Sequence, residues 1–158
     1  MQNIMIDRII HYSVGASASA IKNITLCGNA LSEDYQEFQV IPSSLLLESA
    51  AQLGSFLVEM SYNSPEDIRR ATVNQIDNAK FFRSVEPGDQ LHLLAEIKEL
   101  SKESAKIKVR VVTAESSIVA ETNFTLTLSS IIDEQIHTQK RKLYRIWTRQ
   151  LGDLPPIL

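Results

Sequence analysis

The chain has 158 residues, of which 44% are hydrophobic and 22% charged, and its formal net charge is −3. This length and composition predict one globular domain with a sizeable core, and the slightly acidic balance gives no electrostatic case for nucleic-acid binding. The single cysteine, Cys27, excludes an internal disulfide. The N-terminal segment lacks the apolar run of a signal peptide or membrane helix. We therefore expect a cytoplasmic protein without a membrane anchor.

The first half of the chain predicts one strand and one long helix. Residues 18–27 alternate with β-branched side chains, as in a half-buried strand, and residues 28–39 form a polar connection. The helix should begin after Pro42, be capped by Ser43 or Ser44, and run to about Met60. Because it is apolar on nearly every face, we expect other elements to wrap it on most sides.

Four strand-like stretches follow the helix, separated by short polar turns: residues 71–83, 90–100, 105–114 and 117–128. Short connections without intervening helices favour an antiparallel sheet, so the predicted class is α+β, with one long helix wrapped by one curved sheet. Residues 131–149 predict a second helix, acidic at its start and basic at its end, with an apolar stripe of Ile132, Ile136, Leu143 and Trp147. We therefore expect a main domain over 1–130 and a helical extension over 131–158.

Glu48 is the most informative single residue. It is the only ionisable side chain between Phe38 and Val58, within the apolar helix, so we expect its carboxylate to be buried. A buried carboxylate needs a hydrogen-bond partner or a role in chemistry, and perturbed carboxylates in apolar pockets are candidates for functional sites. The three histidines and one cysteine show no zinc-ligand spacing, and five scattered glycines form no phosphate-binding loop, so neither metal nor cofactor is expected.

Three blocks together resemble the hot-dog-fold 3-hydroxyacyl-[acyl-carrier-protein] dehydratases of the FabZ type. They are residues 6–10 (IDRII) with 20–25 (AIKNIT), residues 40–52 (VIPSSLLLESAAQ) and residues 78–91 (NAKFFRSVEPGDQL). The resemblance implies a hot-dog fold that forms a dimer, with each acyl tunnel between two subunits. It also implies that Glu48 is the catalytic glutamate that helps a hydroxyl group leave as water.

The sequence departs from the family at the catalytic base. The family places a histidine fourteen residues before the helix glutamate, where this chain has Asp34. Asp34 is therefore the candidate base, with the alternative that it is an ordinary solvated loop residue. Of the histidines, His92 is expected on a solvent-facing strand position, and His11 and His137 are expected to be structural. Ser43, Ser44 and Gln52 are the candidate substrate-binding residues, since amides at the helix start can polarise a thioester carbonyl.

Three functions remain open from the sequence. The first is a dehydratase-like protein that binds 3-hydroxyacyl or enoyl thioesters of acyl carrier protein or coenzyme A. The second is a thioesterase in which Glu48 activates water or attacks the thioester directly. The third is a non-catalytic acyl-binding protein, or one half of a heterodimer whose partner supplies a histidine. The basic residues between Lys140 and Arg149 either dock an acidic carrier protein or form a solvated helix face.

Overall fold

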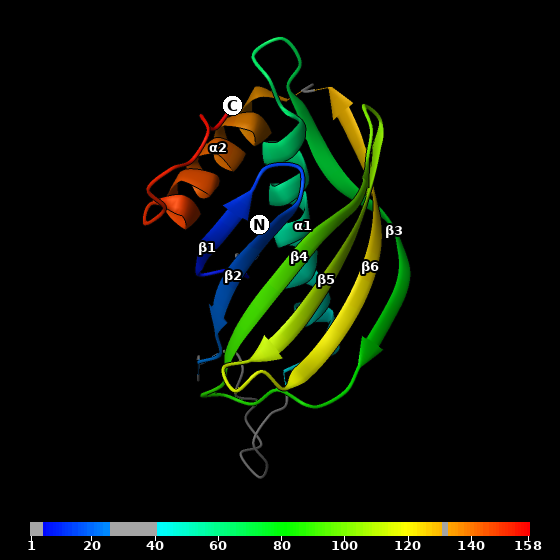
Figure 1. Cartoon of the computed structure of the whole chain (residues 1–158), viewed down its shortest axis with the longest axis vertical. Coiled ribbons are helices and arrows are strands. Elements are labelled where there is room, and N and C mark those ends of the chain that lie inside the picture. The colour runs from blue at the N-terminus through cyan, green and yellow to red at the C-terminus, as the bar shows by residue number, and fades with distance from the viewer. Residues whose placement is uncertain (1–4, 26–40, 131–132) are drawn as a thin grey trace.

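The computed structural model describes residues 5–25, 41–130 and 133–158, which form one curved sheet and two helices (Figure 1). The elements in chain order are β1 (Arg8–Ser13), β2 (Ser17–Asn23), α1 (Ser43–Tyr62), β3 (Arg69–Phe81), β4 (Gln90–Leu100), β5 (Ser104–Thr113), β6 (Ile118–Ser130) and α2 (Glu134–Thr148). The predicted helices and the five predicted strands are present. β1 is additional: Ile9 is its one fully buried side chain, so its sequence carries little periodic signal.

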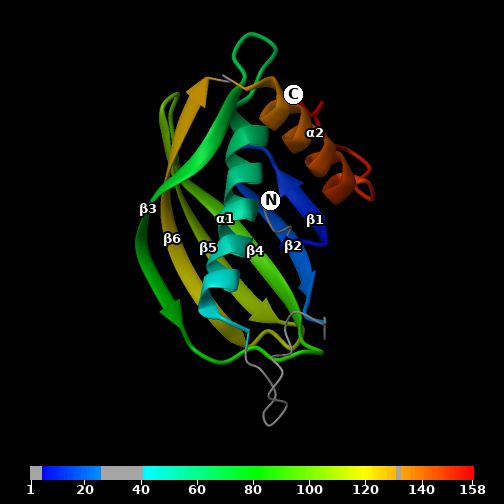
Figure 2. The same ribbon diagram turned by 180° about the vertical axis from the view of Figure 1, so that it is seen from behind.

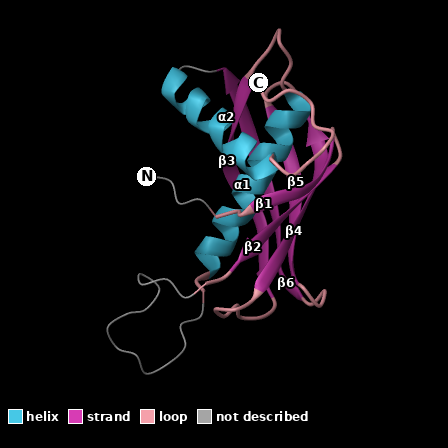
Figure 3. Ribbon diagram, turned by 90° about the vertical axis from the view of Figure 1, so that its left-hand side faces the viewer, coloured by secondary structure: helices cyan, strands magenta, loops and turns pink. Residues whose placement is uncertain are grey.

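The six strands pair in the order β1-β2-β4-β5-β6-β3, and every pairing is antiparallel, as predicted. Seen from behind, α1 lies across the inner face of this sheet, and α2 lies beside the C-terminal half of α1 (Figure 2). Figure 3 shows both helices on the same side of the sheet. This is the α+β arrangement that the sequence predicts.

The core lies between α1 and the inner face of the sheet. Its members include Leu53, Phe56 and Leu57 of α1, Leu93 of β4, Ile107 of β5, and Phe124 and Leu126 of β6. Gly54 lets the helix approach β5 closely, because a Cβ at this position would collide with the end of the Ile107 side chain. Helix and sheet therefore pack directly against each other, leaving the opposite face of α1 for other contacts.

The start of α1 corrects one detail of the prediction. Pro42 is the N-cap residue, and no side chain caps the helix. Ser43 and Ser44 are the first two residues of the helix itself, and both are exposed. The expectation that one of them caps the helix is wrong, because the chain turns into helical geometry one residue earlier than a serine cap requires.

The buried face of α2 also differs from the predicted stripe. Trp147 is buried as expected, but Ile136 is 50% exposed, and the helix instead buries His137 and Tyr144. Ile132 lies outside the described residues. The rings of Tyr144 and Trp147 pack edge-on against Phe56 of α1, with centroids 5.1 Å and 6.4 Å away. His137 and Tyr144 can be buried because their polar atoms have hydrogen-bond partners there. The spacing of apolar residues along α2 does not show these partners.

The outer edge strand β3 is open to solvent. Ile76, Phe81 and Phe82 are all large exposed apolar residues at or just beyond this strand. An exposed, apolar edge strand offers unpaired backbone groups to another chain. Neither described helix is both long and apolar enough to cross a membrane.

Candidate functional site

Glu48 lies at the surface of the chain, which corrects the expectation that its carboxylate is buried. It borders a hollow of about 370 Å³ whose walls come from three elements. α1 contributes Glu48, Ala51 and Gln52, β3 contributes its first residues, and α2 contributes Ile136 and Lys140. Glu48 therefore faces a partly enclosed space bounded by segments that are far apart in the sequence.

Gln52 holds the Glu48 carboxylate. The Gln52 side chain lies one turn further along α1 and donates from Nε2 to Glu48 Oε1 at 2.9 Å. Its other end is fixed, because Gln52 Oε1 accepts a hydrogen bond from the backbone N–H of Met5 at 3.0 Å. Since a backbone N–H can only donate, the amide oxygen of Gln52 must face Met5 and the NH₂ group must face Glu48. The structure thus brings two predicted site residues together.

A second, apolar hollow of about 160 Å³ lies at the N-terminal end of α1. Leu45, Leu46 and Ser49 form its helical side, and Ile24, just after β2, and Leu91 of β4 line the other side. Met5, which holds the Gln52 amide, also lines this hollow. The Met5–Gln52 contact therefore lies between an apolar space and the hollow of Glu48.

Two further predicted residues, Ser43 and Ser44, are not part of this arrangement. Ser43 and Ser44 lie about one turn or more before Glu48 on α1, and neither lines either hollow. Asp34, the candidate base, lies outside the described residues. The roles assigned to these three residues stay predictions.

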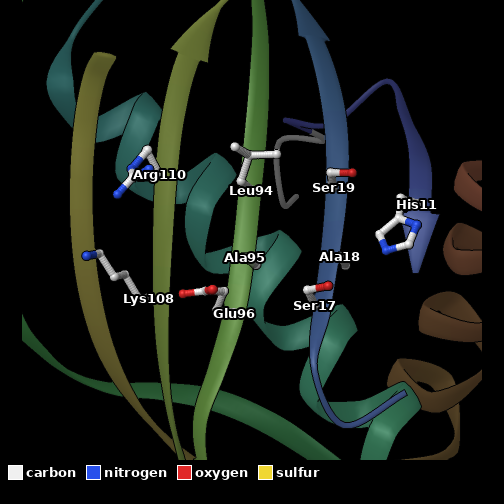
Figure 4. Close-up of a pocket in the computed structure, with 9 residues that line it drawn as sticks. All are labelled: His11, Ser17, Ala18, Ser19, Leu94, Ala95, Glu96, Lys108 and Arg110. Atoms are coloured by element: carbon white, nitrogen blue, oxygen red, sulfur yellow. The ribbon is translucent and has the colours of Figure 1, made fainter. Parts of the chain in front are cut away.

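None of the three histidines lines the hollow of Glu48. His11 borders a hollow of about 270 Å³ on the outer face of the sheet, together with Ser17, Glu96 and Arg110 (Figure 4). His92 is half-buried, with its ring Nε2 3.3 Å from the side-chain oxygen of Gln90, and His137 lies on the buried face of α2. The structure therefore agrees with the sequence that no histidine of this chain stands beside Glu48.

The outer hollow of Figure 4 carries ordinary surface charges. Lys98 pairs with Glu96 at 2.9 Å, and Lys108 and Arg110 both pair with Glu121 across neighbouring strands. Exposed pairs of this kind contribute little and are screened by salt. Within residues 5–25, 41–130 and 133–158, no cluster of three His, Cys, Asp or Glu side chains could hold a metal ion.

The buried carboxylate of α1 is Glu59, which the sequence analysis did not single out. It is 1% exposed and accepts hydrogen bonds from the backbone N–H of Ala71 at 2.9 Å and from the hydroxyl of Tyr144. Arg70 Nη1 lies 3.5 Å from Glu59 Oε2, and Arg70 Nη2 lies 2.6 Å from Nδ1 of His137. These contacts join α1, β3 and α2 through a network of four buried polar side chains.

Helical geometry explains why Glu59 rather than Glu48 is buried. Eleven residues separate them, which is three turns plus about 20°, so both lie on nearly the same face of α1. α2 covers this face only near the C-terminal end of α1, as Figure 2 shows. Glu59 is buried under α2, whereas Glu48 stays exposed and shares only a hollow with Ile136 and Lys140 of α2. The helical spacing in the sequence places both glutamates on one face of α1. The position of α2 determines which end of that face is covered.

Burial in the network shifts the pKa values of Tyr144 and His137 in opposite directions. Burial, and then the Glu59 carboxylate, hold the pKa of Tyr144 well above its usual value of 10.0, so its hydroxyl remains a donor. Burial lowers the pKa of His137 below 6.5, the neighbouring Arg70 and Arg141 lower it further, and Glu134 opposes them. Because Arg70 donates to Nδ1, His137 must be neutral with its proton on Nε2.

Stability should therefore fall as the pH drops below about 6.5. The folded-state pKa of His137 is lower than the unfolded value, so the unfolded chain binds more protons in this range. The contribution is fully present above pH 6.5 and is lost as the pH falls through the folded-state pKa. Urea unfolding from pH 7.5 to 5 should show a smaller pH dependence in His137→Asn, whose amide oxygen can still accept from Arg70. His92→Gln, on the outer face, should behave like the wild type; an identical slope in all three proteins would contradict the assignment.

Comparisons with known proteins agree on the family. Residues 3–124 match the FabA-like domain family. The chain is 33% identical to the 3-hydroxyacyl-[acyl-carrier-protein] dehydratase FabZ of Rickettsia rickettsii (strain Sheila Smith) over 122 residues, which cover 77% of this chain and 83% of that protein. It is also 33% identical to the FabZ of Listeria monocytogenes serotype 4b (strain CLIP80459) over 128 residues, which cover 81% of this chain and 87% of that one.

Solved structures agree on the fold. A protein from Streptococcus mutans UA159, bound to acetyl CoA, superimposes with a TM-score of 0.65 at 15% identity, covering 82% of this chain and 94% of that one. A thioesterase from Haemophilus influenzae superimposes with a TM-score of 0.62 at 15% identity, covering 80% of each chain. The predicted hot-dog fold is confirmed, and the chain belongs to the family of FabZ-type 3-hydroxyacyl-[acyl-carrier-protein] dehydratases.

Proposed function

We propose that the chain binds acyl thioesters beside Glu48 and dehydrates 3-hydroxyacyl thioesters in fatty-acid or polyketide-type synthesis. The observation that carries the proposal is the carboxylate of Glu48, which stands at the family's motif position, is held by Gln52 and faces a hollow. Its FabZ relatives are named for dehydration of acyl-carrier-protein thioesters. A cytoplasmic location belongs to the same proposal.

The geometry supports Glu48 as the acid. Gln52 donates to Oε1 of Glu48, so Oε1 is an acceptor and Oε2 is the oxygen left to carry a proton. In the proposed step a base removes the proton from the carbon next to the thioester carbonyl. The electron pair forms the carbon–carbon double bond, the bond to the 3-hydroxyl breaks, and Oε2 protonates the departing oxygen to give water. Ala51, Ala71, Val73 and Ile136 also line the hollow of Glu48 and offer apolar surface against which an acyl chain can lie.

The mechanism also needs a base that removes the proton next to the thioester carbonyl. We propose Asp34 for it, since the three histidines of this chain lie away from the Glu48 hollow. A carboxylate can serve as a base when its surroundings tune its pKa. Asp34→Asn should then stop turnover while leaving thioester binding intact. If the wild type itself is inactive, Asp34→His becomes the informative change, because it restores the family's residue type at that position.

A dimer is the second part of the proposal. The exposed edge of β3 and the exposed Ile76, Phe81 and Phe82 favour pairing with a second chain. Light scattering should show no stable monomer at micromolar concentration. Ile76→Lys should shift the protein towards a monomer, while Ile118→Lys, at a similarly exposed isoleucine on β6, should not. A folded wild-type monomer would contradict the dimer.

The choice of reaction can be tested directly. Purified protein is given 3-hydroxybutyryl and butyryl thioesters of coenzyme A and of acyl carrier protein. Dehydration appears as the absorbance of the conjugated enoyl thioester, and hydrolysis appears as free thiol. Enoyl product without thiol release supports the dehydratase, and thiol release supports a thioesterase in which Glu48 activates water. If the thioesters bind but neither product forms, the result supports an acyl-binding protein, or a subunit that needs a histidine-bearing partner.

The carrier can be identified by its charge. Lys142, Arg145 and Arg149 are exposed on α2, whereas Lys140 and Arg141 are half-buried. If this face docks an acidic carrier protein, association should weaken steeply with salt, because exposed charges are screened beyond about 10 Å at roughly 0.1 M. Replacing Arg145 and Arg149 with Ser should slow binding of acyl carrier protein but leave binding of an acyl-CoA unchanged. If the wild type and this variant bind acyl carrier protein equally well, the basic residues of α2 form a solvated face and do not dock the carrier.

A further inference from the structure

α2 contributes to the hollow of Glu48 although it lies outside the part of the chain that matches the family. The FabA-like match ends at residue 124, and α2 begins at Glu134. Nevertheless Ile136 and Lys140, one helical turn apart, line the same hollow as Glu48. This wall is therefore a feature of the present chain rather than of the matched domain.

The wall is held firmly in place. Arg70 lines the hollow and at the same time contacts Glu59 at 3.5 Å and His137 at 2.6 Å. Tyr144 donates to Glu59 and stacks on Trp147, and the ammonium of Lys140 lies 5.7 Å from the centroid of the Tyr144 ring. Buried polar contacts and aromatic packing therefore fix α2, and with it the wall of the hollow that Ile136 and Lys140 form.

Ile136 is the largest apolar side chain among the described residues that line the hollow. The other apolar residues known to line it are smaller: Ala51, Ala71 and Val73. Ile136 is 50% exposed, so it can be enlarged or shortened without opening the core. Its size should decide how much apolar chain fits between α2 and Glu48.

We propose that Ile136 is a specificity-determining residue that limits the length of the acyl group accepted at the Glu48 site. This inference rests on the proposed function, because it assumes that an acyl thioester occupies the hollow. Shortening Ile136 makes room for additional methylene groups, and enlarging it excludes them. Each methylene buried or excluded changes affinity by about fourfold.

The experiment compares Ile136 with a matched position. Ile146 is also on α2, is 51% exposed, and does not line the hollow, so it reports the general effect of changing an exposed isoleucine on this helix. Ile136→Ala, Ile136→Phe, Ile146→Ala and Ile146→Phe are each titrated by calorimetry with 3-hydroxybutyryl and 3-hydroxydecanoyl thioesters of coenzyme A. Trp147 is the only tryptophan of the chain, so its emission shows whether α2 stays docked, and light scattering checks the oligomeric state.

Ile136→Ala should raise the affinity for the ten-carbon ligand relative to the four-carbon one by about tenfold, and Ile136→Phe should lower it by a similar factor. Both Ile146 variants should keep the wild-type ratio. Equal ratios in all five proteins, or the same shift at both positions, would overturn the inference while leaving thioester binding established. If the wild type binds neither ligand, the proposed function fails first, and the assignment of Ile136 fails with it.

Discussion

Replacing Glu48 with glutamine should lower turnover of a 3-hydroxyacyl thioester by about 100-fold or more, the usual contribution of a positioned acid or base. The substitution keeps the shape of the side chain and removes the proton that the leaving hydroxyl requires. The hydrogen bond from Gln52 can be retained, because the glutamine oxygen still accepts it. Since Glu48 is exposed within the single chain, the fold should be unaffected.

The measurement is kcat for formation of the enoyl thioester, with affinity for the substrate measured separately. Glu66→Gln is the matched control, because Glu66 is an exposed glutamate in the turn beyond the far end of α1. A loss confined to kcat in Glu48→Gln would support its role as the acid, and unchanged turnover would remove Glu48 from the mechanism. Gln52→Ala should give an intermediate loss, since Glu48 then remains but is no longer held.

Replacing Glu59 with glutamine should destabilise the protein by about 3–5 kcal/mol, because it leaves the buried Arg70 guanidinium without its counter-charge. Glu59 is also the acceptor for Tyr144 and for the backbone of Ala71, so the loss affects three elements at once. A change of this size is a large part of the total stability of about 5–15 kcal/mol expected for a domain.

Urea unfolding followed by circular dichroism and Trp147 emission checks this expectation. Glu96→Gln breaks an exposed pair with Lys98 and should cost about 1 kcal/mol or less. Arg70→Met should also be strongly destabilising, but adding it to Glu59→Gln should cost much less than the sum of the two single changes, because no buried charge then remains unpaired. Simple additivity would show that the two charges do not interact across the α1–β3 contact.

Local patterns in the sequence were sufficient for most of the secondary structure. The apolar run after Pro42 predicts α1, and the alternating stretches between polar turns predict β3 to β6 within a few residues of their observed ends. The partnership of Glu48 with Gln52 was also accessible, because residues four apart on a helix share a face. β1 gave no comparable signal, since one buried isoleucine does not make an alternation.

The chain's amino-acid sequence by itself thus determined an α+β domain, the antiparallel pairing of its strands and the placement of Glu48 on the long helix. Only the tertiary structure decided which glutamate of α1 is buried, because that depends on where α2 lies and not on any periodicity within α1. The same holds for the hollow of Glu48, whose walls come from segments about 20 and 90 residues further along the chain. Contacts over such separations are fixed by packing of the whole chain, so residues such as Arg70, Ile136 and His137 carry no local signal of the partners they meet.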